Sequence, residues 1–303
     1  MTVMIPFDQG EVHLEWIALT DAIAKGHDGP KAQVEDVFLY RDDNTLLNRS
    51  AWIKGMGVAV KCATIFPANR DVGKPMIGGA VNLFSDDDGR LEAILDFALV
   101  TKWKTAGDSL LAARRLARPD SRNILIVGAG TVGRSLHAAY SAAFPDAQFT
   151  VWNRSIKGAK DFAKECSGTS IATDLETAVR KADIITSATM STEPLIKGAW
   201  LQAGQHVDLI GAYRPDMREV DDAALLRSQI FVDNMHTTID HIGELKIPIT
   251  SGVLPVENVI ADYYALERFV RKNDDDITLF KNGGGAHLDL MTSRYILDQW
   301  NSR

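Results

Sequence analysis

The sequence predicts an α/β protein in which a doubly wound parallel sheet follows a smaller, mixed α+β domain. A glycine-rich turn at 128–133 stands between a short apolar run and a helical pattern, which is typical of the first crossover of a parallel sheet. Strand-like and helix-like segments alternate after this turn. Before it, several strand-like runs are separated only by short turns, which indicates a mixed or antiparallel sheet.

The 303 residues are enough for two domains, and 46% hydrophobic with 24% charged residues is ordinary for a globular protein. A formal net charge of -7 argues against nucleic acid or an anionic membrane as a partner. No apolar run has membrane-spanning length and no signal peptide is evident, so we expect a cytoplasmic protein. Cys62 and Cys166 fit a reducing compartment, a single disulfide being the alternative, and the seven histidines have no metal-ligand spacing.

The first domain is expected to span residues 1–119. Apolar residues at helical spacing predict a helix within 11–28 and a long helix over 97–116, which Arg118 and Pro119 end. Between the two helices the sequence predicts strands at 37–40, 46–52, 57–64, 78–84 and 91–95.

Two basic residues lie within these predicted strands. Arg49 lies in the run 46–52, and Lys61 shares a strand face with Ala59 and Ala63 because side chains alternate between faces. Each alone is most simply a surface residue, since lysine is rarely buried without a partner. Two cations on neighbouring strands instead favour a clamp for a carboxylate, to which arginine offers a planar fork and lysine a point charge.

The glycine-rich turn has the spacing Gly128-x-Gly130-x-x-Gly133 and directly follows an apolar run. Gly128 allows a tight turn, Gly130 lets the backbone approach a pyrophosphate, and Gly133 lets the next helix pack against the sheet. The first amides of that helix, those of Thr131 and Val132 included, then face the phosphates. We interpret the turn as a Rossmann-type dinucleotide site; a glycine-rich turn without a ligand is the alternative.

The next strand is predicted at 149–152 and ends at Asn153, Arg154 and Ser155. An acidic residue at this place would bind the ribose hydroxyls of NAD and repel a 2′-phosphate, whereas Asn153 followed by Arg154 suits NADP. We therefore expect NADPH as the cofactor, with NAD(H) as the second candidate. The alternative for Arg154 is a cation on a solvated loop.

Further strands are expected within 183–189, 205–212, 229–232 and 278–281. Ligands of such sheets lie outside the carboxyl ends of the strands, so residues at these ends are expected beside the dinucleotide: Ser187, Ala188, Thr189 and Gly211. A triple-glycine turn that includes Gly284 is expected near the nicotinamide. The dinucleotide domain thus spans 120–286, and a C-terminal helix within 287–303 is expected to complete the first domain.

Several segments of the chain carry a resemblance to a known family: 60–64, 101–106, 112–117, 128–133, 152–155, 211–219 and 278–284. Over nearly its whole length the sequence resembles the ornithine cyclodeaminase and mu-crystallin family. Its members include the cyclodeaminase, ketimine reductases acting on cyclic imino acids, amino-acid dehydrogenases and binding proteins. The resemblance implies a homodimer built through the first domain's sheet, and Lys61 matches the family's active-site lysine.

Departures from the family pattern help to choose among these reactions. The cyclodeaminase has an acidic residue where this chain has Tyr213, and its Glu-Met-Pro run, whose Glu holds the distal amine, is replaced by 48–50. At the centre of that run, Arg49 would repel an ornithine ammonium. Lys104 replaces the family's arginine in the carboxylate clamp, a loss for which Arg49 is placed to compensate.

We therefore expect an NAD(P)H-dependent oxidoreductase that reduces cyclic ketimine acids, Δ1-pyrroline-2-carboxylate to L-proline and Δ1-piperideine-2-carboxylate to L-pipecolate. Lys61 and Arg49 would fix the substrate carboxylate, with Lys104 sharing the task. Two alternatives stay open. One is an ornithine cyclodeaminase that makes proline and ammonia with NAD, and the other is a non-catalytic NADPH-binding protein of mu-crystallin type that carries a small acid.

Overall fold

The computed structural model describes residues 2–302 and divides into two compact units. The first comprises Met1–Lys104 and Gly284–Arg303, and the second comprises Thr105–Gly283. The division falls within the long helix, whereas the sequence analysis places the domain boundary after it. The second half of the helix belongs to the second unit, where its last residue, Leu116, is held by hydrogen bonds. The carbonyl oxygen of Leu116 accepts from Arg271 Nε at 3.0 Å and from Thr278 Oγ1 at 3.2 Å.

The first unit is built on a six-stranded sheet. Its strands are β1 (Val3–Ile5), β2 (Gln33–Arg41), β3 (Asn44–Ile53), β4 (Gly57–Ile65), β5 (Ile77–Phe84) and β6 (Leu91–Asp96). Its helices are α1 (Phe7–Glu11), α2 (Trp16–His27), the 3-10 helix η1 (Pro67–Val72), the start of α3 (Phe97–Leu116), and α10 (Ala286–Asn301). The strand order is β1-β6-β5-β4-β3-β2, with β1 parallel to β6 and the other pairs antiparallel. The predicted strands are all present, and β1 is an edge strand that the sequence analysis does not predict.

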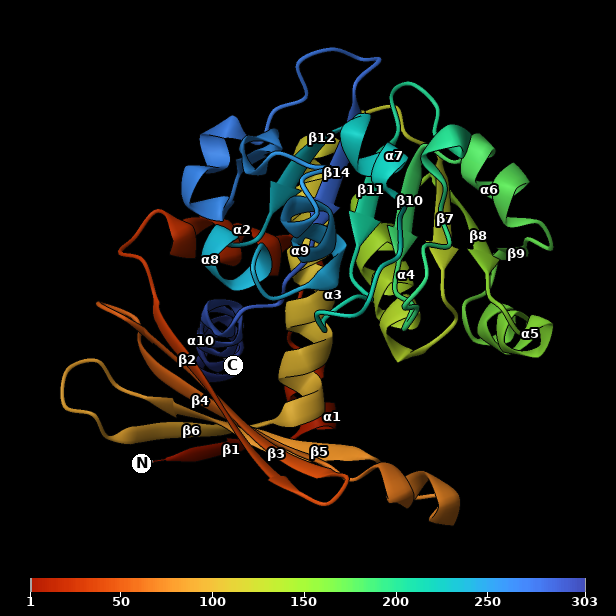
Figure 1. The fold of residues 1–303 in the computed structure, drawn as a ribbon. Coiled ribbons are helices and arrows are strands. Elements are labelled where there is room, and N and C mark those ends of the chain that lie inside the picture. Colours follow the sequence, from red (N-terminus) through yellow and green to blue (C-terminus); the bar gives the residue numbers. More distant parts are fainter. Residues whose placement is uncertain (1, 303) are drawn as a thin grey trace. The chain divides into compact units, whose positions relative to one another are not determined.

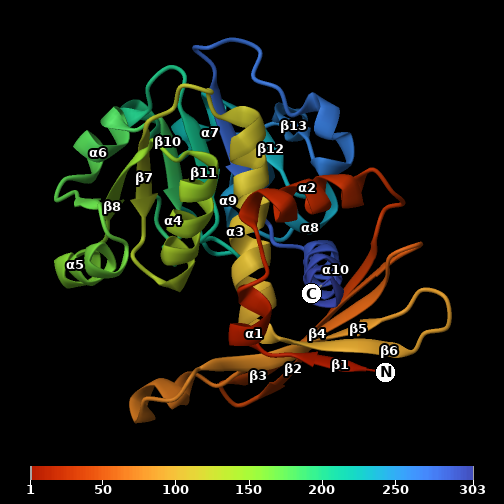
Figure 2. The same ribbon diagram turned by 180° about the vertical axis from the view of Figure 1, so that it is seen from behind.

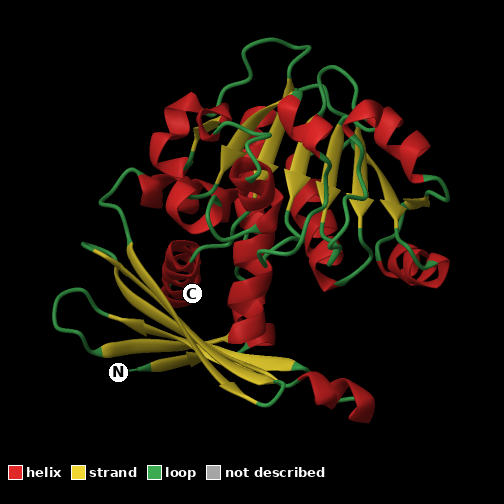
Figure 3. Ribbon diagram, viewed as in Figure 1, coloured by secondary structure: helices red, strands yellow, loops and turns green. Residues whose placement is uncertain are grey.

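One row of side chains crosses this whole sheet on a single face. Successive cross-strand neighbours in this row are Asp36, Arg49, Lys61, Val81, Leu95 and Ile5. The apolar half, from Val81 to Ile5, is buried in the core. α10 packs against this face of the sheet, which Figure 3 shows with the helix seen end-on. The register therefore places the charged half of the row directly under a buried helix.

The second unit is an eight-stranded parallel sheet with helices on both faces (Figures 1 and 2). Its strands are β7 (Asn123–Val127), β8 (Gln148–Trp152), β9 (Ser170–Ile171), β10 (Ile184–Ser187), β11 (His206–Leu209), β12 (Ser228–Val232), β13 (Val259–Ala261) and β14 (Ile277–Lys281). Its helices, besides the rest of α3, are α4 (Thr131–Ala143), α5 (Ile156–Glu165), α6 (Leu175–Lys181), η2 (Gly198–Trp200), α7 (Asp222–Leu226), α8 (Met235–Thr238), α9 (Gly243–Thr250), η3 (Val256–Asn258) and η4 (Tyr263–Arg268).

The strand order β13-β12-β14-β11-β10-β7-β8-β9 confirms the doubly wound sheet. The chain runs outward from β7 through α4, β8 and α5 to the edge strand β9, and α6 then returns it to β10 on the other side of β7. Because such crossovers are right-handed, α4 and α5 cover one face and α6 covers the other. The carboxyl ends of β7 and β10 meet where the winding reverses, which is where ligands bind in this class of sheet.

Candidate functional site

Three basic side chains of the first unit lie close together on the face of its sheet that α10 covers. Lys61 of β4 donates to Asp289 Oδ1 of α10 at 2.9 Å, and both residues are buried. Arg49 of β3 lies directly opposite Lys61 in the register and forms a bidentate ion pair with Asp36 of β2, at 2.5 to 3.2 Å. Lys104 of α3 is also buried. We refer to Arg49, Lys61 and Lys104 as the cation cluster.

The carbonyl oxygen of Gly284 joins two members of the cation cluster. It accepts hydrogen bonds from Arg49 Nη1 at 2.8 Å and from Lys104 Nζ at 3.0 Å. Gly284 has a φ of 64°, in the left-handed region that favours glycine. The sequence analysis expects Gly284 beside a nicotinamide, and this contact stays a prediction. The contacts that the structure contains are those with Arg49 and Lys104.

The charges of this site leave a positive excess. Among residues 2–302 these three cations form ion pairs with two carboxylates, those of Asp36 and Asp289, so the cation cluster and its acidic partners together have one more positive than negative charge. Burial lowers the pKa of Lys61 to about 8, with Asp289 opposing the decrease and Lys104 and Arg49 adding to it. Burial acts to raise the pKa of Asp289, but the three nearby cations hold it below its ordinary value.

The buried His287 on α10 adds no charge to the site at neutral pH. Its pKa is lowered well below the ordinary value by burial, and then by His27, Lys104 and Arg49. Because the pKa of Lys61, which burial lowers to about 8, still lies above neutral pH, we expect this lysine to be protonated there and the site to carry a net charge of about one. A buried excess of this sign and size suits one carboxylate of a small molecule.

The glycine turn of the second unit contains two glycines that the fold requires and one that it does not. A Cβ at Gly133 would lie 2.3 Å from the carbonyl oxygen of Gly128. At Gly128, whose φ is 110°, a Cβ would lie 2.6 Å from the carbonyl oxygen of Ala188. At Gly130 a Cβ would meet no described atom within 4 Å, and a φ of -82° suits any residue. The space beside Gly130 is thus open for the close approach of a pyrophosphate.

The helix that follows the turn presents unused backbone donors. α4 begins at Thr131 with Gly130 as its N-cap, and no side chain caps it. The amides of Thr131, Val132 and Gly133 have no acceptor within the helix and lie at the positive end of its dipole, an arrangement that binds phosphate. Arg134 Nη1 donates to the carbonyl oxygen of Gly130 at 3.2 Å, a contact that the sequence analysis does not predict.

In the segment 153–155 the first and third residues bond to the protein, and the second is an exposed cation. Asn153 Oδ1 accepts from the amide of Ala129 at 3.1 Å, and its Nδ2 donates to the carbonyl oxygen of Ser155 at 3.0 Å. Ser155 caps α5 through its hydroxyl. Arg154 between them is exposed and makes no hydrogen bond or ion pair with the described part of the chain. Its guanidinium group is therefore available to an anion from solution.

The exit loops of β10 and β11 lie against each other at the carboxyl edge of the sheet. A Cβ at Gly211 would lie 1.9 Å from the carbonyl oxygen of Thr189, so only glycine allows this approach. The hydroxyl of Ser187 is buried and donates to Glu219 at 2.6 Å, so this side chain faces the protein. These loops, which include Ala188, would therefore contact a dinucleotide through their backbone and their small side chains.

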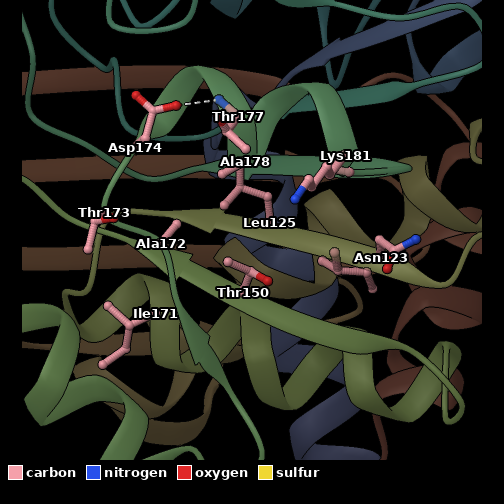
Figure 4. A pocket seen from close by; sticks show the side chains of 12 residues that line it. Asn123, Leu125, Thr150, Ile171, Ala172, Thr173, Asp174, Thr177, Ala178 and Lys181 are labelled. Atoms are coloured by element: carbon pink, nitrogen blue, oxygen red, sulfur yellow. Dashed lines mark hydrogen bonds between the residues drawn. The ribbon is translucent and has the colours of Figure 1, made fainter.

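A cavity of about 360 Å³ in the second unit contains none of the predicted site residues (Figure 4). Its lining includes Leu125 of β7, Thr150 of β8 and Lys181 of α6. Its carboxylate, that of Asp174, caps α6 by accepting from the amide of Thr177 at 2.8 Å. Because that carboxylate serves the fold, we assign no site to this cavity. Among residues 2–302 no cluster of His, Cys, Asp or Glu is placed to hold a metal, and no helix is long and apolar enough to cross a membrane.

The predicted residues thus form two groups, the cation cluster with Gly284 in the first unit and the glycine turn with its neighbouring loops in the second. The acidic partners Asp36, Asp289 and Glu219 are not among the residues predicted from the sequence. Asp289 carries a signal that could have revealed it, because it is a charged residue between Leu288 and Leu290 in a helix with an apolar face. No comparable pattern marks Asp36 on its edge strand.

Comparisons with known proteins give one family and a shared fold. A sequence model of the ornithine cyclodeaminase/mu-crystallin family matches residues 50–303. A Delta(1)-pyrroline-2-carboxylate reductase of Paracoccus denitrificans (strain Pd 1222) is 50% identical over 291 residues, which cover 93% of this chain and 92% of that protein. The solved structure of Thermococcus litoralis Delta(1)-pyrroline-2-carboxylate reductase in complex with NADH and L-proline has a TM-score of 0.90 at 24% identity, over 99% of this chain and 97% of that one. An archaeal alanine dehydrogenase dimer with bound NAD also has a TM-score of 0.90, at 26% identity over 99% and 96% of the two chains.

Proposed function

The chain belongs to the ornithine cyclodeaminase/mu-crystallin family, and from this premise we propose that it reduces cyclic ketimine acids with NAD(P)H. The substrates we propose are Δ1-pyrroline-2-carboxylate, which gives L-proline, and Δ1-piperideine-2-carboxylate, which gives L-pipecolate. The 50% identity to a Delta(1)-pyrroline-2-carboxylate reductase over 93% of the chain supports this reaction.

The observation that carries the proposal is the positive excess of the cation cluster, of which Lys61 and Lys104 are buried and Arg49 is partly exposed. A cyclic ketimine acid has one carboxylate and, when its nitrogen is protonated, one iminium charge. Lys61, Arg49 and Lys104 would hold the carboxylate, because in the described part of the chain the three cations are paired with only two carboxylates. Doubly protonated ornithine would bring a second ammonium to a site that is already positive, so the same excess disfavours the cyclodeaminase reaction.

The chemistry asks little else of the protein. A bound reduced nicotinamide supplies the hydride to C2 of the substrate. The protonated iminium is a good hydride acceptor and already carries the proton that the product amine keeps. The residues of this chain therefore contribute by fixing the carboxylate and hence the position of C2, and such positioning accounts for a large part of the acceleration.

The cofactor site that we propose uses the second unit. The amides of Thr131, Val132 and Gly133 bind the pyrophosphate beside the open position at Gly130. Arg154 is exposed and has no hydrogen-bond or ion-pair partner among the described residues, so it would pair with the 2′-phosphate, and we propose a preference for NADPH over NADH. Ala188, Thr189 and Gly211, whose backbones pack closely together, would form the wall along which the rest of the dinucleotide lies.

A spectrophotometric panel tests the proposal. Each cyclic imine is mixed with NADPH and with NADH, and ornithine is mixed with NAD⁺ while ammonia is measured. We expect oxidation of NADPH by both imines and no ammonia from ornithine. Ammonia release would favour the cyclodeaminase, and tight NADPH binding without oxidation by any imine would favour a carrier of a small acid.

We also propose that the protein is a cytoplasmic homodimer assembled through the sheet of the first unit. The edge strand β2 exposes Val37, Phe38, Leu39 and Tyr40, with exposed fractions between 46% and 73%. An exposed apolar edge strand is a template for pairing unless another chain covers it. The cysteines Cys62 and Cys166 are free thiols, as in a reducing compartment.

A further inference from the structure

The buried carboxylate of Glu219 holds the exit loops of two strands together. Its Oε1 accepts from Ser187 Oγ, at the end of β10, at 2.6 Å and from both the amide and the hydroxyl of Thr189, in the loop after β10, at 2.8 Å. Its Oε2 accepts from the amide of Gly211 at 2.6 Å and from that of Ala212 at 3.2 Å, in the loop after β11. One side chain thus bonds to both loops at the carboxyl edge of the sheet.

The Glu219 carboxylate is itself fixed from behind. Glu219 is fully buried, and its backbone amide donates to Glu244 Oε2 at 2.7 Å. Lys281 of β14 is also fully buried. Burial raises the pKa of both Glu219 and Glu244, and the positive charge of Lys281 acts to lower it. Lys281 in turn donates to the carbonyl oxygens of Leu209 and Asn282 at 2.8 and 2.7 Å. The carboxylate therefore sits in a network with little freedom to move.

The two loops that Glu219 joins approach each other as closely as backbones can. A Cβ at Gly211 would lie 1.9 Å from the carbonyl oxygen of Thr189 and 2.7 Å from Glu219 Oε1. The adjoining Ala188 lies against Gly128 of the glycine turn, where a Cβ would be 2.6 Å from its carbonyl oxygen. A shift of the two loops would therefore reach the turn that begins the dinucleotide site.

We propose that Glu219 is a positioning residue that fixes the exit loops of β10 and β11 as the wall on which the nicotinamide half of the cofactor rests. The proposal rests on the function proposed above. Glu219 itself need not touch the cofactor, because it acts through the backbone of Thr189 and Gly211. A reacting carbon held by such a wall loses rate steeply when the wall moves, since an error of about 1 Å costs up to about a hundredfold.

Glu219→Gln tests the proposal with almost no change of shape. The amide that replaces one carboxylate oxygen carries N–H groups, and these would face the N–H or O–H donors that now bond to that oxygen. At least one loop must then lose its bonds and move. Glu219→Asp keeps the carboxylate but shortens its reach, so it should restore part of the loss, and it serves as the test if the glutamine variant does not fold.

Asp183→Asn is the matched control. Asp183 precedes β10 at the opposite edge of the same sheet, and its Oδ2 accepts from the amides of Arg122 and Asn123, both at 2.9 Å. This variant should lower the melting temperature as Glu219→Gln does, because it also leaves backbone donors without a carboxylate. It should not alter cofactor geometry, since it lies away from the carboxyl edge.

The full-length variants are compared in melting temperature, in NADPH dissociation constant by fluorescence titration, and in hydride-transfer rate at saturating NADPH in a single turnover. For Glu219→Gln we expect an NADPH dissociation constant about tenfold higher and a transfer rate about ten- to a hundredfold lower, against less than about twofold for Asp183→Asn. Equal effects of the two variants on binding and rate would overturn the proposal. If the native protein oxidises no NADPH with any imine, the proposed function fails, while the NADPH titrations still decide the role of Glu219.

Discussion

Replacing Asp289 by asparagine should move the pH dependence of the reaction. The proposed anchor Lys61 must be protonated to hold a carboxylate, so kcat/KM should be high at low pH and fall as pH rises through the Lys61 pKa of about 8. Asp289, 2.9 Å from Lys61, acts to raise that pKa. Without the Asp289 charge the burial of Lys61 and the nearby cations act unopposed, and the fall in kcat/KM should begin at lower pH.

The size of the change follows from the burial of the pair. Breaking a buried ion pair costs about 3 kcal/mol or more, which corresponds to a change of roughly a hundredfold in the acid dissociation constant of Lys61. At pH 7 the charged fraction of Lys61 would fall from about nine-tenths to about one-tenth. We therefore expect kcat/KM for Δ1-pyrroline-2-carboxylate to fall about tenfold at pH 7, about a hundredfold at pH 9, and less than about twofold at pH 5.5.

The measurement is kcat/KM from pH 5 to 9 with NADPH held at saturation. Asp298→Asn is the control, because Asp298 lies on the same helix but is not among the charges that shift the pKa of Lys61. A loss of the same factor at every pH in Asp289→Asn would refute the reasoning, since it would mean that the carboxylate only stabilises the fold.

Four further substitutions, which make three tests, address the cofactor site and the proposed dimer interface. Arg154→Asp should weaken NADPH binding by about tenfold or more and leave NADH binding nearly unchanged, and equal losses in fluorescence titrations would exclude the 2′-phosphate contact. Gly130→Ala should keep the native melting temperature and lose cofactor affinity, whereas Gly133→Ala should melt several degrees lower, because its Cβ would lie 2.3 Å from the carbonyl oxygen of Gly128; a lower melting temperature for Gly130→Ala would contradict this. Phe38→Asp should give monomers in light scattering, and a dimer of unchanged mass would contradict assembly through β2.

Local patterns in the sequence predict most of the helices and strands of the fold. The helix at 97–116 has the bounds that its apolar spacing and the following Pro119 predict, and the apolar run before Gly128 forms the strand Asn123–Val127. The glycine turn was equally readable, because each of its requirements lies within six residues of sequence. The three-residue β1 was not predicted, because a strand of that length acquires its identity from pairing with β6 across the sheet.

The contacts that tune the site depend on chain neighbours far apart in sequence. Lys61 and Asp289 are separated by 228 positions, and Arg49 and Asp36 meet only because of the β2–β3 register. The strand patterns predict that Arg49 and Lys61 share a sheet, and the register makes them direct neighbours. The sequence does not indicate which acidic residues pair with Arg49 and Lys61, because an ion pair between residues far apart in the chain leaves no periodic pattern in the sequence.

The most direct test of the central claim removes Lys61 from the protein and, separately, the carboxylate from the substrate. Δ1-Pyrroline-2-carboxylate and Δ1-pyrroline, which lacks the carboxylate, are each reduced by the native protein and by Lys61→Ala at saturating NADPH. If Lys61 holds the carboxylate, the variant should lose about a hundredfold in kcat/KM with the acid and less than about threefold with Δ1-pyrroline, with NADPH affinity unchanged. Equal losses with the two substrates would contradict the claim that this lysine holds the substrate's carboxylate.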